Sequence, residues 1–239
     1  MDGNGCDVVI LCGGLGKRLR PVVSDRPKPM AEIGGKPFVQ LLVEHIGRFG
    51  FRRFVLGAGY KAEMIADHFK AVSLPFEIKV AVEHEPLGTG GGLRNVRGLL
   101  DADTVLALNG DSFCSVDYRR IVEGHLARAA DATVAVVPVP DAGAFGSIIM
   151  DGTGMVTAFN EKQSGGQGLV NAGVYVFRSS VIRSLPETTP LSLEKDVFPQ
   201  LIGRLFGHKV DGPLFDIGTP ESYRLAQQAL PVLMCQEPR

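Results

Sequence analysis

Short apolar runs alternate with stretches of helical periodicity through the first half of the chain. The runs are rich in β-branched residues, and several are apolar on both faces, which is typical of parallel strands covered by helices. One helical stretch has Pro37 at its start and Gly50 at its stop. The pattern predicts strands at 8–12, 53–58, 76–82, 104–109 and 133–139, and helices at 37–49, 61–70, 91–100 and 118–129. This succession predicts a doubly wound α/β fold with a mostly parallel sheet.

The second half of the chain has a less regular pattern. Two apolar runs flank a DGTG turn and predict a hairpin. Thr219 precedes a helical stretch that has Pro at its first position, as an N-cap residue does. The expected elements are hairpin strands at 146–151 and 155–160, strands at 169–177, 206–210 and 213–217, and helices at 193–202 and 219–230. Because the chain has no repeat, low-complexity linker or shift in composition, we expect one domain over residues 1–230 and a frayed tail at 231–239.

Composition narrows the class of protein. The chain has 239 residues, of which 45% are hydrophobic, and a formal net charge of −1. A nucleic-acid partner bound through a broad basic face is therefore not expected. The four cysteines lie far apart and form no CxxC pair, so we expect a reducing compartment without a disulfide framework or zinc site. No apolar stretch approaches the ~20 residues of a membrane span, and we predict a cytoplasmic protein without a membrane partner.

A glycine-rich segment, GGLGKRLRP, follows the first predicted strand. Glycines at this place let backbone N–H groups approach a phosphate or a base closely. The segment differs from the dinucleotide-binding fingerprint because Leu19 stands at the third glycine position. It differs from the Walker A motif because Arg18 follows Lys17 where Ser or Thr is needed. We interpret it as a phosphate-binding loop with Arg18 as charge partner; the alternative is an ordinary turn with solvated basic residues.

Lys28 lies between two prolines downstream of this loop. Pro29 favours an extended conformation at Lys28, and Pro27 fixes its own φ. A lysine held in this way loses less freedom when it binds an anion. Without the loop upstream, a surface polyproline turn would explain the segment better.

Two aspartates, Asp111 and Asp216, stand at the ends of predicted strands. Ligands of doubly wound sheets bind beyond the carboxyl ends of the strands. Two carboxylates at that edge are able to share one Mg²⁺ with nucleotide phosphates, because this ion needs few protein ligands. The alternative is that Asp111 caps a turn and Asp216 caps the entry to a helix.

A further charged pair, Glu161 and Lys162, follows the predicted hairpin, and Asn171-Ala172-Gly173 lies early in the next strand. A carboxylate beside a lysine suits a sugar phosphate, with hydroxyls bound by Glu161 and phosphate by Lys162. The alternative is an exposed ion pair of little energetic value. The histidines form no HxxxH or HExxH pattern and no serine lies in a GxSxG elbow, so a histidine metal site and serine-hydrolase chemistry have no support.

In this order, the segments resemble the signatures of the sugar-1-phosphate nucleotidyltransferase family over essentially the whole chain. The resemblance rests on GGLGKRL at 13–19, PKPM at 27–30, GKP at 35–37, PLGTG at 86–90, NGD at 109–111, FNEK at 159–162, NAG at 171–173 and DIGTP at 216–220. Within the family, residues 24–25, 85–91 and 192–196 are most similar to D-glycero-α-D-manno-heptose 1-phosphate guanylyltransferases. Lys17 replaces the Thr and Cys12 the Ala of many members, and we expect neither change to remove a required group.

The resemblance implies a Rossmann-like, glycosyltransferase-A-like fold of three layers, α/β/α. Its nucleotide-binding part would span about 1–115 and its sugar-phosphate-binding part about 116–230. The implied reaction converts a nucleoside triphosphate and a sugar 1-phosphate into a nucleotide sugar and pyrophosphate, with Mg²⁺ as cofactor. Both substrates are small molecules, and we expect a monomer or a homodimer.

The functional residues of the family carry over to the matching positions of this chain. The catalytic residues implied are Lys28, Arg18 and Asp111. The residues implied to bind the nucleotide are Leu11, Gly13, Gly14, Gly16, Lys17, Arg18, Lys28, Glu83, Gly88 and Thr89. The residues implied to bind the sugar phosphate are Asn109, Gly146, Glu161, Lys162, Asn171, Gly173 and Lys195. The residues implied to hold the metal are Asp111 and Asp216.

Glu83 indicates which base the nucleotide carries. Family members that use uridine or thymidine triphosphates resemble one another in having Gln at this position, five residues before the glycine that corresponds to Gly88. A carboxylate only accepts hydrogen bonds, and guanine offers it two adjacent donors. We therefore expect GTP as the nucleotide and, with the heptose resemblance, GDP-heptose as the product. In the alternative, Glu83 ends a strand in solvent while Glu85 or backbone groups bind the base.

Other functions stay open at this point. The chain is also compatible with a mannose-1-phosphate guanylyltransferase, with another enzyme that joins UTP or dTTP to a hexose 1-phosphate, or with an inactive subunit that senses sugar nucleotides. An inactive subunit would lack part of the charged set. This chain has all five of its members, Arg18, Lys28, Asp111, Lys162 and Asp216.

Overall fold

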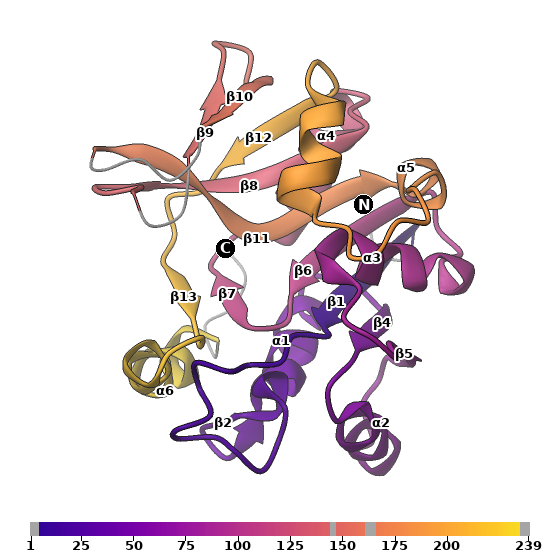
Figure 1. The fold of residues 1–239 in the computed structure, drawn as a ribbon, viewed down its shortest axis with the longest axis vertical. Helices are drawn as coiled ribbons and strands as arrows, with labels where there is room; N and C mark the ends of the chain where they lie inside the picture. Colours follow the sequence, from indigo (N-terminus) through magenta and orange to yellow (C-terminus); the bar gives the residue numbers. More distant parts are fainter. Residues whose placement is uncertain (1–4, 144–146, 161–165, 235–239) are drawn as a thin grey trace.

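A seven-stranded sheet forms the centre of the molecule (Figure 1). The structure is a computed structural model and describes residues 5–143, 147–160 and 166–234. The strands follow the order β12-β8-β11-β6-β1-β4-β5. Their bounds are β1 (Cys6–Cys12), β4 (Arg53–Ala58), β5 (Glu77–Val82), β6 (Thr104–Asn109), β8 (Ala132–Val139), β11 (Gly168–Arg178) and β12 (Leu205–Lys209). β11 runs antiparallel to both of its neighbours and the other pairs of this sheet are parallel, which confirms the prediction of a mostly parallel sheet.

Alternate side chains of the central strand β1 point to opposite faces of the sheet and join two apolar cores. The helices that cover the sheet are α1 (Phe38–Gly47), α2 (Ala62–Ala71), α3 (Gly88–Asn95), α4 (Tyr118–Ala127), α5 (Ser179–Arg183) and α6 (Pro220–Leu233). Val8 and Ile10 pack into the core formed with α1, α2, α4 and α6. Val9 packs into the core formed with α3 and α5. The expected three-layer arrangement is therefore confirmed.

Two of the predicted helices are divided. The helix expected at 91–100 starts earlier, as α3, and ends in a 3₁₀ turn, η3 (Arg97–Leu99). The helix expected at 193–202 is instead a π-helical turn, η4 (Leu193–Val197), followed by a 3₁₀ turn, η5 (Phe198–Leu201). Pro199 has no N–H group for an α-helical hydrogen bond, which explains why a regular helix does not continue through this segment.

Helix α6 runs further than the sequence predicts. The pattern places its end at Leu230, before a tail that starts at Pro231, but the helix continues to Leu233. Pro231 removes one backbone donor from the helix. Leu230 and Met234 are both buried, and their packing offsets the lost hydrogen bond. Thr219 caps the helix as predicted.

The shorter described strands build three two-stranded ladders beside the central sheet. The predicted hairpin is confirmed as β9 (Ser147–Met150) paired with β10 (Val156–Asn160). The strand expected at 213–217 is β13 (Leu214–Asp216), which pairs antiparallel with β7 (Ser112–Cys114). The sequence pattern does not indicate β7, because a run of three residues is too short to show periodicity. For the same reason it does not indicate the third ladder, β2 (Glu32–Ile33) paired with β3 (Lys36–Pro37), or the 3₁₀ turn η2 (Lys28–Met30).

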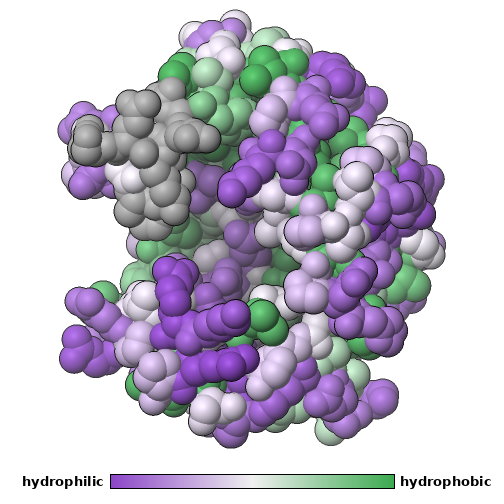
Figure 2. Space-filling view, viewed as in Figure 1, coloured by the Kyte–Doolittle hydropathy of each residue, from purple (hydrophilic) through white to green (hydrophobic). Residues whose placement is uncertain are grey.

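Figure 2 shows a face that is hollowed between the part of the molecule around β8 and β11 and the part around α6 and β2. Hydrophilic side chains gather along the lower rim of this hollow. The segment that follows β1, drawn in indigo in Figure 1, runs along the same side. Within the described ranges, no helix is both long enough and apolar enough to cross a membrane.

Candidate active site

Three charged side chains meet where β7 pairs with β13. Asp216 lies opposite Ser112 in this ladder, and the N–H of Ile217 donates to the carbonyl of Asp111 at 2.9 Å. The ladder therefore holds the two aspartates together although they are far apart in the chain. Nζ of Lys28 lies 2.7 Å from Oδ2 of Asp111 and 3.5 Å from Oδ1 of Asp216. The structure thus brings these three predicted site residues into one centre.

Lys28 is the most enclosed member of this centre. Its side chain is 9% exposed, whereas the side chains of Asp111 and Asp216 are 43% and 45% exposed. The extended conformation expected at Lys28 is wrong, because Lys28 begins the turn η2 and the extended residue is Pro27. The enclosed side chain of Lys28 is also not that of a surface polyproline turn. The alternative in which Asp216 caps a helix is wrong, because Thr219 is the N-cap of α6.

The two carboxylates fit a divalent cation that shares its ligands with phosphate. Among the described residues, no group of three or more His, Cys, Asp or Glu side chains is placed to hold a metal. Mg²⁺ needs fewer, because it commonly keeps several waters and binds one or two carboxylates together with substrate phosphates. Oδ1 of Asp216 is buried without a hydrogen-bond partner, which is the state of an oxygen that an incoming cation would satisfy.

The glycine-rich loop is anchored at both ends and open between them. The carbonyl of Leu11 accepts a hydrogen bond from the N–H of Gly110 at 2.9 Å, and Leu19 is buried. A Cβ atom at Gly14 would meet nothing within 4 Å, and the side chain of Lys17 is exposed. Backbone N–H groups in such a loop are accessible to an anion.

Gly16 brings this loop against Lys28. Its φ of +57° lies in the left-handed region, where glycine carries no steric penalty. A Cβ atom there would lie 3.0 Å from Cβ of Lys28, which is closer than most neighbours tolerate. The close approach sets the loop backbone beside the carboxylate–lysine centre.

Arg18 reaches the same centre from the loop. A Cβ atom at Gly218 would lie 3.1 Å from Nη2 of Arg18 and 2.7 Å from Oδ2 of Asp216. The guanidinium and the carboxylate therefore both border Gly218. This arrangement adds a second cation to that of Lys28 at the mouth of the loop.

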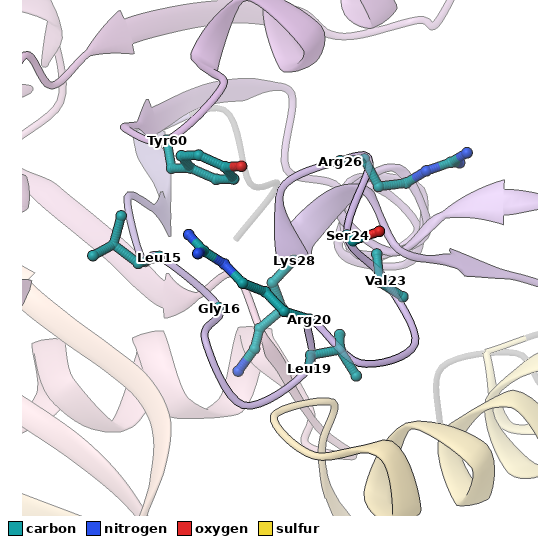
Figure 3. Close-up of a pocket in the computed structure, with 9 residues that line it drawn as sticks. All are labelled: Leu15, Gly16, Leu19, Arg20, Val23, Ser24, Arg26, Lys28 and Tyr60. Atoms are coloured by element: carbon teal, nitrogen blue, oxygen red, sulfur yellow. The ribbon is translucent and has the colours of Figure 1, made fainter.

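Arg20 and Tyr60 line the loop on its other side, and the sequence analysis does not single them out. The guanidinium carbon of Arg20 lies 5.4 Å from the centre of the Tyr60 ring, a cation–π distance. Figure 3 shows both side chains around a small pocket that Gly16 and Lys28 also line, with Arg26 pointing away from Tyr60. Tyr60 follows β4, which neighbours β1. Tyr60 could have been predicted from the rule that ligands bind beyond the carboxyl ends of the strands.

Glu83 lies at the end of β5, against the start of the glycine loop. A Cβ atom at Gly13 would collide with its carboxylate, and one at Gly92 in α3 would lie 3.0 Å from Oε1. Glu83 is buried, and this burial raises the pKa of its carboxyl. The alternative in which Glu83 ends a strand in solvent is therefore wrong. Glu85, two residues further on, is exposed.

Gly88 and Thr89 contact the chain segment that leads into η4. Gly88 has a φ of +77°, and a Cβ atom there would press on the carbonyl of Leu191. The hydroxyl of Thr89 accepts a hydrogen bond from the N–H of Leu193 at 2.9 Å and donates to Oε2 of Glu194 at 3.2 Å. Both residues therefore tie the first turn of α3 to this segment.

The residues predicted to bind the sugar phosphate meet partly where β6 lies beside β11. Asn171 accepts a hydrogen bond from the N–H of Gly173 at 2.9 Å and donates to the hydroxyl of Tyr175 at 2.9 Å. A Cβ atom at Gly173, which has a φ of +71°, would lie 2.8 Å from Nδ2 of Asn109. Oδ1 of Asn109 is buried without a hydrogen-bond partner.

The other residues predicted to bind the sugar phosphate are not found beside Asn109, Asn171 and Gly173 in the described part of the structure. Lys195 is exposed in η4, where its backbone N–H donates to Oγ of Ser192 at 3.3 Å. The predictions for Gly146, Glu161 and Lys162 concern positions outside the described residues. Glu194, beside Lys195, accepts hydrogen bonds from both halves of the site, and sequence reasoning does not identify it as a site residue.

Known proteins are similar in sequence to most of this chain. A D-glycero-alpha-D-manno-heptose 1-phosphate guanylyltransferase of Aneurinibacillus thermoaerophilus is 36% identical over 226 residues, which are 94% of this chain and 98% of that protein. A mannose-1-phosphate guanylyltransferase of Mycobacterium tuberculosis is 38% identical over 224 residues. The match covers 91% of this chain but 62% of that longer relative.

Solved structures of known proteins are also similar to this chain. HddC from Yersinia pseudotuberculosis, crystallised with GMP-PN, superposes with a TM-score of 0.83 at 36% identity and covers 94% of this chain and 99% of that one. A Bacillus anthracis structure described as a glucose-1-phosphate thymidylyltransferase superposes with a TM-score of 0.80 at 20% identity, a likeness of fold alone. The sequence model described as nucleotidyl transferase matches residues 7–231. The chain therefore belongs to the nucleotidyl transferase family, as a sugar-1-phosphate nucleotidyltransferase.

Proposed function

We propose that this enzyme joins GTP to D-glycero-α-D-manno-heptose 1-phosphate and releases GDP-heptose and pyrophosphate. The observation that carries the reaction type is the centre of Lys28, Asp111 and Asp216 beside a glycine loop. The choice of substrates is supported by the Aneurinibacillus relative, which this chain covers almost completely, and by the likeness to HddC, whose structure holds GMP-PN.

In the proposed reaction, an oxygen of the sugar phosphate attacks the α-phosphorus of GTP. The bond between the α-phosphorus and the oxygen that bridges to the β-phosphate breaks, and pyrophosphate leaves with the electron pair. Negative charge grows on the leaving oxygens, and cations that are already in position stabilise it. Lys28 pairs with both aspartates, and Arg18 borders Gly218 beside Asp216. No covalent bond to the protein is required.

Enzymes of this family typically use a divalent metal, and we propose Mg²⁺ here. Asp111 and Asp216 would hold the ion, which when bound would neutralise part of the phosphate charge. Lys28 contacts both carboxylates in the free protein, so it already compensates their charge where the ion would bind.

Glu83 supports guanine as the base. Its carboxylate lies against Gly13 and Gly92, so it borders the space next to the loop backbone. A carboxylate accepts from two donors at once, and the ring N–H and exocyclic amino group of guanine supply such a pair. A pyrimidine edge that alternates carbonyl, N–H and carbonyl offers only one donor.

The remaining features of the proposal rest on the sequence. We propose that Gly146, Glu161, Lys162 and Lys195 join Asn109, Asn171 and Gly173 around the sugar phosphate. We also keep a single domain over residues 1–230, which acts as a monomer or a homodimer. The described cysteines are all free, which supports a reducing compartment such as the cytoplasm.

A matrix of nucleotides against sugar phosphates tests the proposal. GTP, UTP, dTTP and ATP are each combined with heptose, mannose and glucose 1-phosphates, and pyrophosphate release is measured. We expect the highest kcat/KM for GTP with D-glycero-α-D-manno-heptose 1-phosphate. A preference for UTP or dTTP would contradict the assignment of the base.

Mannose 1-phosphate is the second candidate for the sugar, because the Mycobacterium tuberculosis relative is 38% identical. The same matrix decides between the two sugars. A higher kcat/KM for mannose 1-phosphate than for the heptose would replace the heptose assignment while leaving the guanylyltransferase assignment intact.

A further inference from the structure

The carboxylate of Glu194 lies between the glycine-rich helix α3 and the inner part of β11. Oε2 is 3.2 Å from the hydroxyl of Thr89 and 3.0 Å from that of Ser192. Oε1 is 3.3 Å from the hydroxyl of Tyr175 and 3.4 Å from Nδ2 of Asn171. An ionised carboxylate has no proton to donate, so all four groups donate to it.

On the nucleotide side, the hydrogen bonds have a fixed direction. The hydroxyl of Thr89 accepts from the N–H of Leu193, so its own proton points to Glu194. Thr89 belongs to the first turn of α3, and Gly92 of the same helix lies against the carboxylate of Glu83. Glu194 therefore helps to fix the helix that borders the proposed base-binding residue.

On the sugar side, a second series of contacts leads from Glu194 towards Asn109, whose Oδ1 has no hydrogen-bond partner. Tyr175 is fully buried, and burial raises the pKa of its hydroxyl well above the ordinary value, so it stays a donor. Its oxygen accepts from Nδ2 of Asn171 at 2.9 Å, which leaves its proton for Glu194. Asn171 in turn accepts from the N–H of Gly173, which lies against Nδ2 of Asn109. Oδ1 of Asn109 is buried and unpaired, two residues before Asp111.

We propose that Glu194 is a positioning residue for both substrates. Through Tyr175 and Asn171 it holds Gly173 against the amide of Asn109, so that Oδ1 of Asn109 is left to accept from a hydroxyl of the sugar phosphate. Through Thr89 it holds α3 for the nucleotide. The inference rests on the proposed function, because it assumes that a nucleotide and a sugar phosphate bind at these two ends. Glu194 lies in the π-helical turn η4, and π-helical turns occur frequently at functional sites.

The proposal is tested with variants that remove the hydrogen bonds of Glu194 on the sugar side and on the nucleotide side separately. Tyr175→Phe removes the sugar-side donor, Thr89→Val removes the nucleotide-side donor, and Glu194→Gln disturbs both. Thr89→Ser restores the hydroxyl and serves as the conservative rescue. Tyr118→Phe is the matched control, because this tyrosine is also fully buried and its hydroxyl donates to the carbonyl of Cys114, outside the network.

Binding of GTP and of the sugar 1-phosphate is measured separately by calorimetry, and KM and kcat by pyrophosphate release. We expect Tyr175→Phe to weaken sugar phosphate binding on the order of tenfold with GTP affinity unchanged, and Thr89→Val to do the reverse. Glu194→Gln should weaken both, while Tyr118→Phe should behave as the wild type does. Thr89→Ser should recover most of the GTP affinity that Thr89→Val loses.

Two outcomes would overturn the positioning role. One is that Tyr175→Phe and Thr89→Val each weaken both substrates equally, as a general loss of structure would. The other is that Glu194→Gln changes neither affinity. A failure of the proposed function is seen separately, because it appears in the wild type as a preference for another nucleotide or sugar. The variants are then compared with that preferred pair.

Discussion

Lys28 contacts two carboxylates in the free protein and faces the phosphates in the proposed reaction. Lys28→Met keeps the volume of its mostly enclosed side chain and removes the charge. We expect the variant to fold and its kcat to fall on the order of 10²–10³-fold, as happens when a donor to a developing oxyanion is removed. The measurement is pyrophosphate release at saturating GTP and sugar phosphate.

Lys70→Met is the control for this experiment, because Lys70 is an exposed residue of α2 that pairs with Asp67. It should retain wild-type turnover. Near wild-type kcat in a folded Lys28→Met protein would remove Lys28 from the mechanism.

Glu83→Gln is predicted to change the preference for the base. The variant exchanges an acceptor-only side chain for one that also donates, which suits a pyrimidine edge better than guanine. A hydrogen bond to a charged group contributes about 1.5–3 kcal/mol, so the ratio of kcat/KM for GTP over UTP should fall roughly tenfold to a hundredfold. Glu85→Gln is the matched control, since Glu85 is exposed. An unchanged ratio in Glu83→Gln would assign base recognition to other groups.

At the scale of elements, the ladder of β7 and β13 determines where the two aspartates lie. Asp111→Asn and Asp216→Asn each remove an anionic oxygen from this ladder without a change of shape. We expect each variant to lose activity or to require a much higher Mg²⁺ concentration, because this cation prefers charged oxygen ligands. Activity is titrated with Mg²⁺, with the exposed Asp67→Asn as control. Unaltered Mg²⁺ titrations in both variants would show that these carboxylates hold no metal.

The strands that the first half contributes to the central sheet could be predicted from the sequence alone. β4 and β6 have the predicted bounds, because each is an apolar run whose side chains are buried on both faces of the sheet. The end of η4 and the continuation of α6 past Pro231 could not be predicted from the sequence. Each depends on how a segment that contains a proline packs against the rest of the molecule.

The residues of the candidate site were predictable where one segment carries the chemistry. The glycine loop and Lys28 lie within a few positions of each other, and their residue types indicate phosphate binding. Glu194 has no such signal, because its partners Thr89 and Tyr175 come from distant parts of the chain. Only the fold reveals that Glu194 joins residues from these distant segments in one network.

At the scale of the whole molecule, buried histidines make stability depend on pH. Burial lowers the pKa of His45 and of His125 from 6.5 to about 4. Between pH 6.5 and pH 4 these histidines are protonated in the unfolded chain but neutral in the folded chain. The free energy of unfolding therefore decreases as the pH falls from 6.5 towards 4. Each histidine contributes up to ~1.4 kcal/mol per pH unit in this window.

Urea unfolding at pH 7 and pH 5 measures this effect. We expect the wild type to lose on the order of 1–2 kcal/mol per buried histidine between the two values. His125→Gln should show a smaller loss than the wild type, because one of the two groups no longer titrates. The raised pKa of Glu83 acts in the opposite direction in both proteins and so cancels in the comparison. An equal loss in both proteins would exclude His125 as a source of the pH dependence.

The pairing of β7 with β13 also determines when the charged centre forms as the chain is synthesised. The ribosome adds about a hundred residues between Asp111 and Asp216, which takes roughly 5–20 s. During this interval the nascent chain already contains the glycine loop, Lys28 and the first aspartate, but it lacks the second carboxylate. The centre is completed only when β13, the last described strand, docks beside β7. A growing chain therefore lacks the complete centre of Lys28, Asp111 and Asp216 until the last described strand is in place.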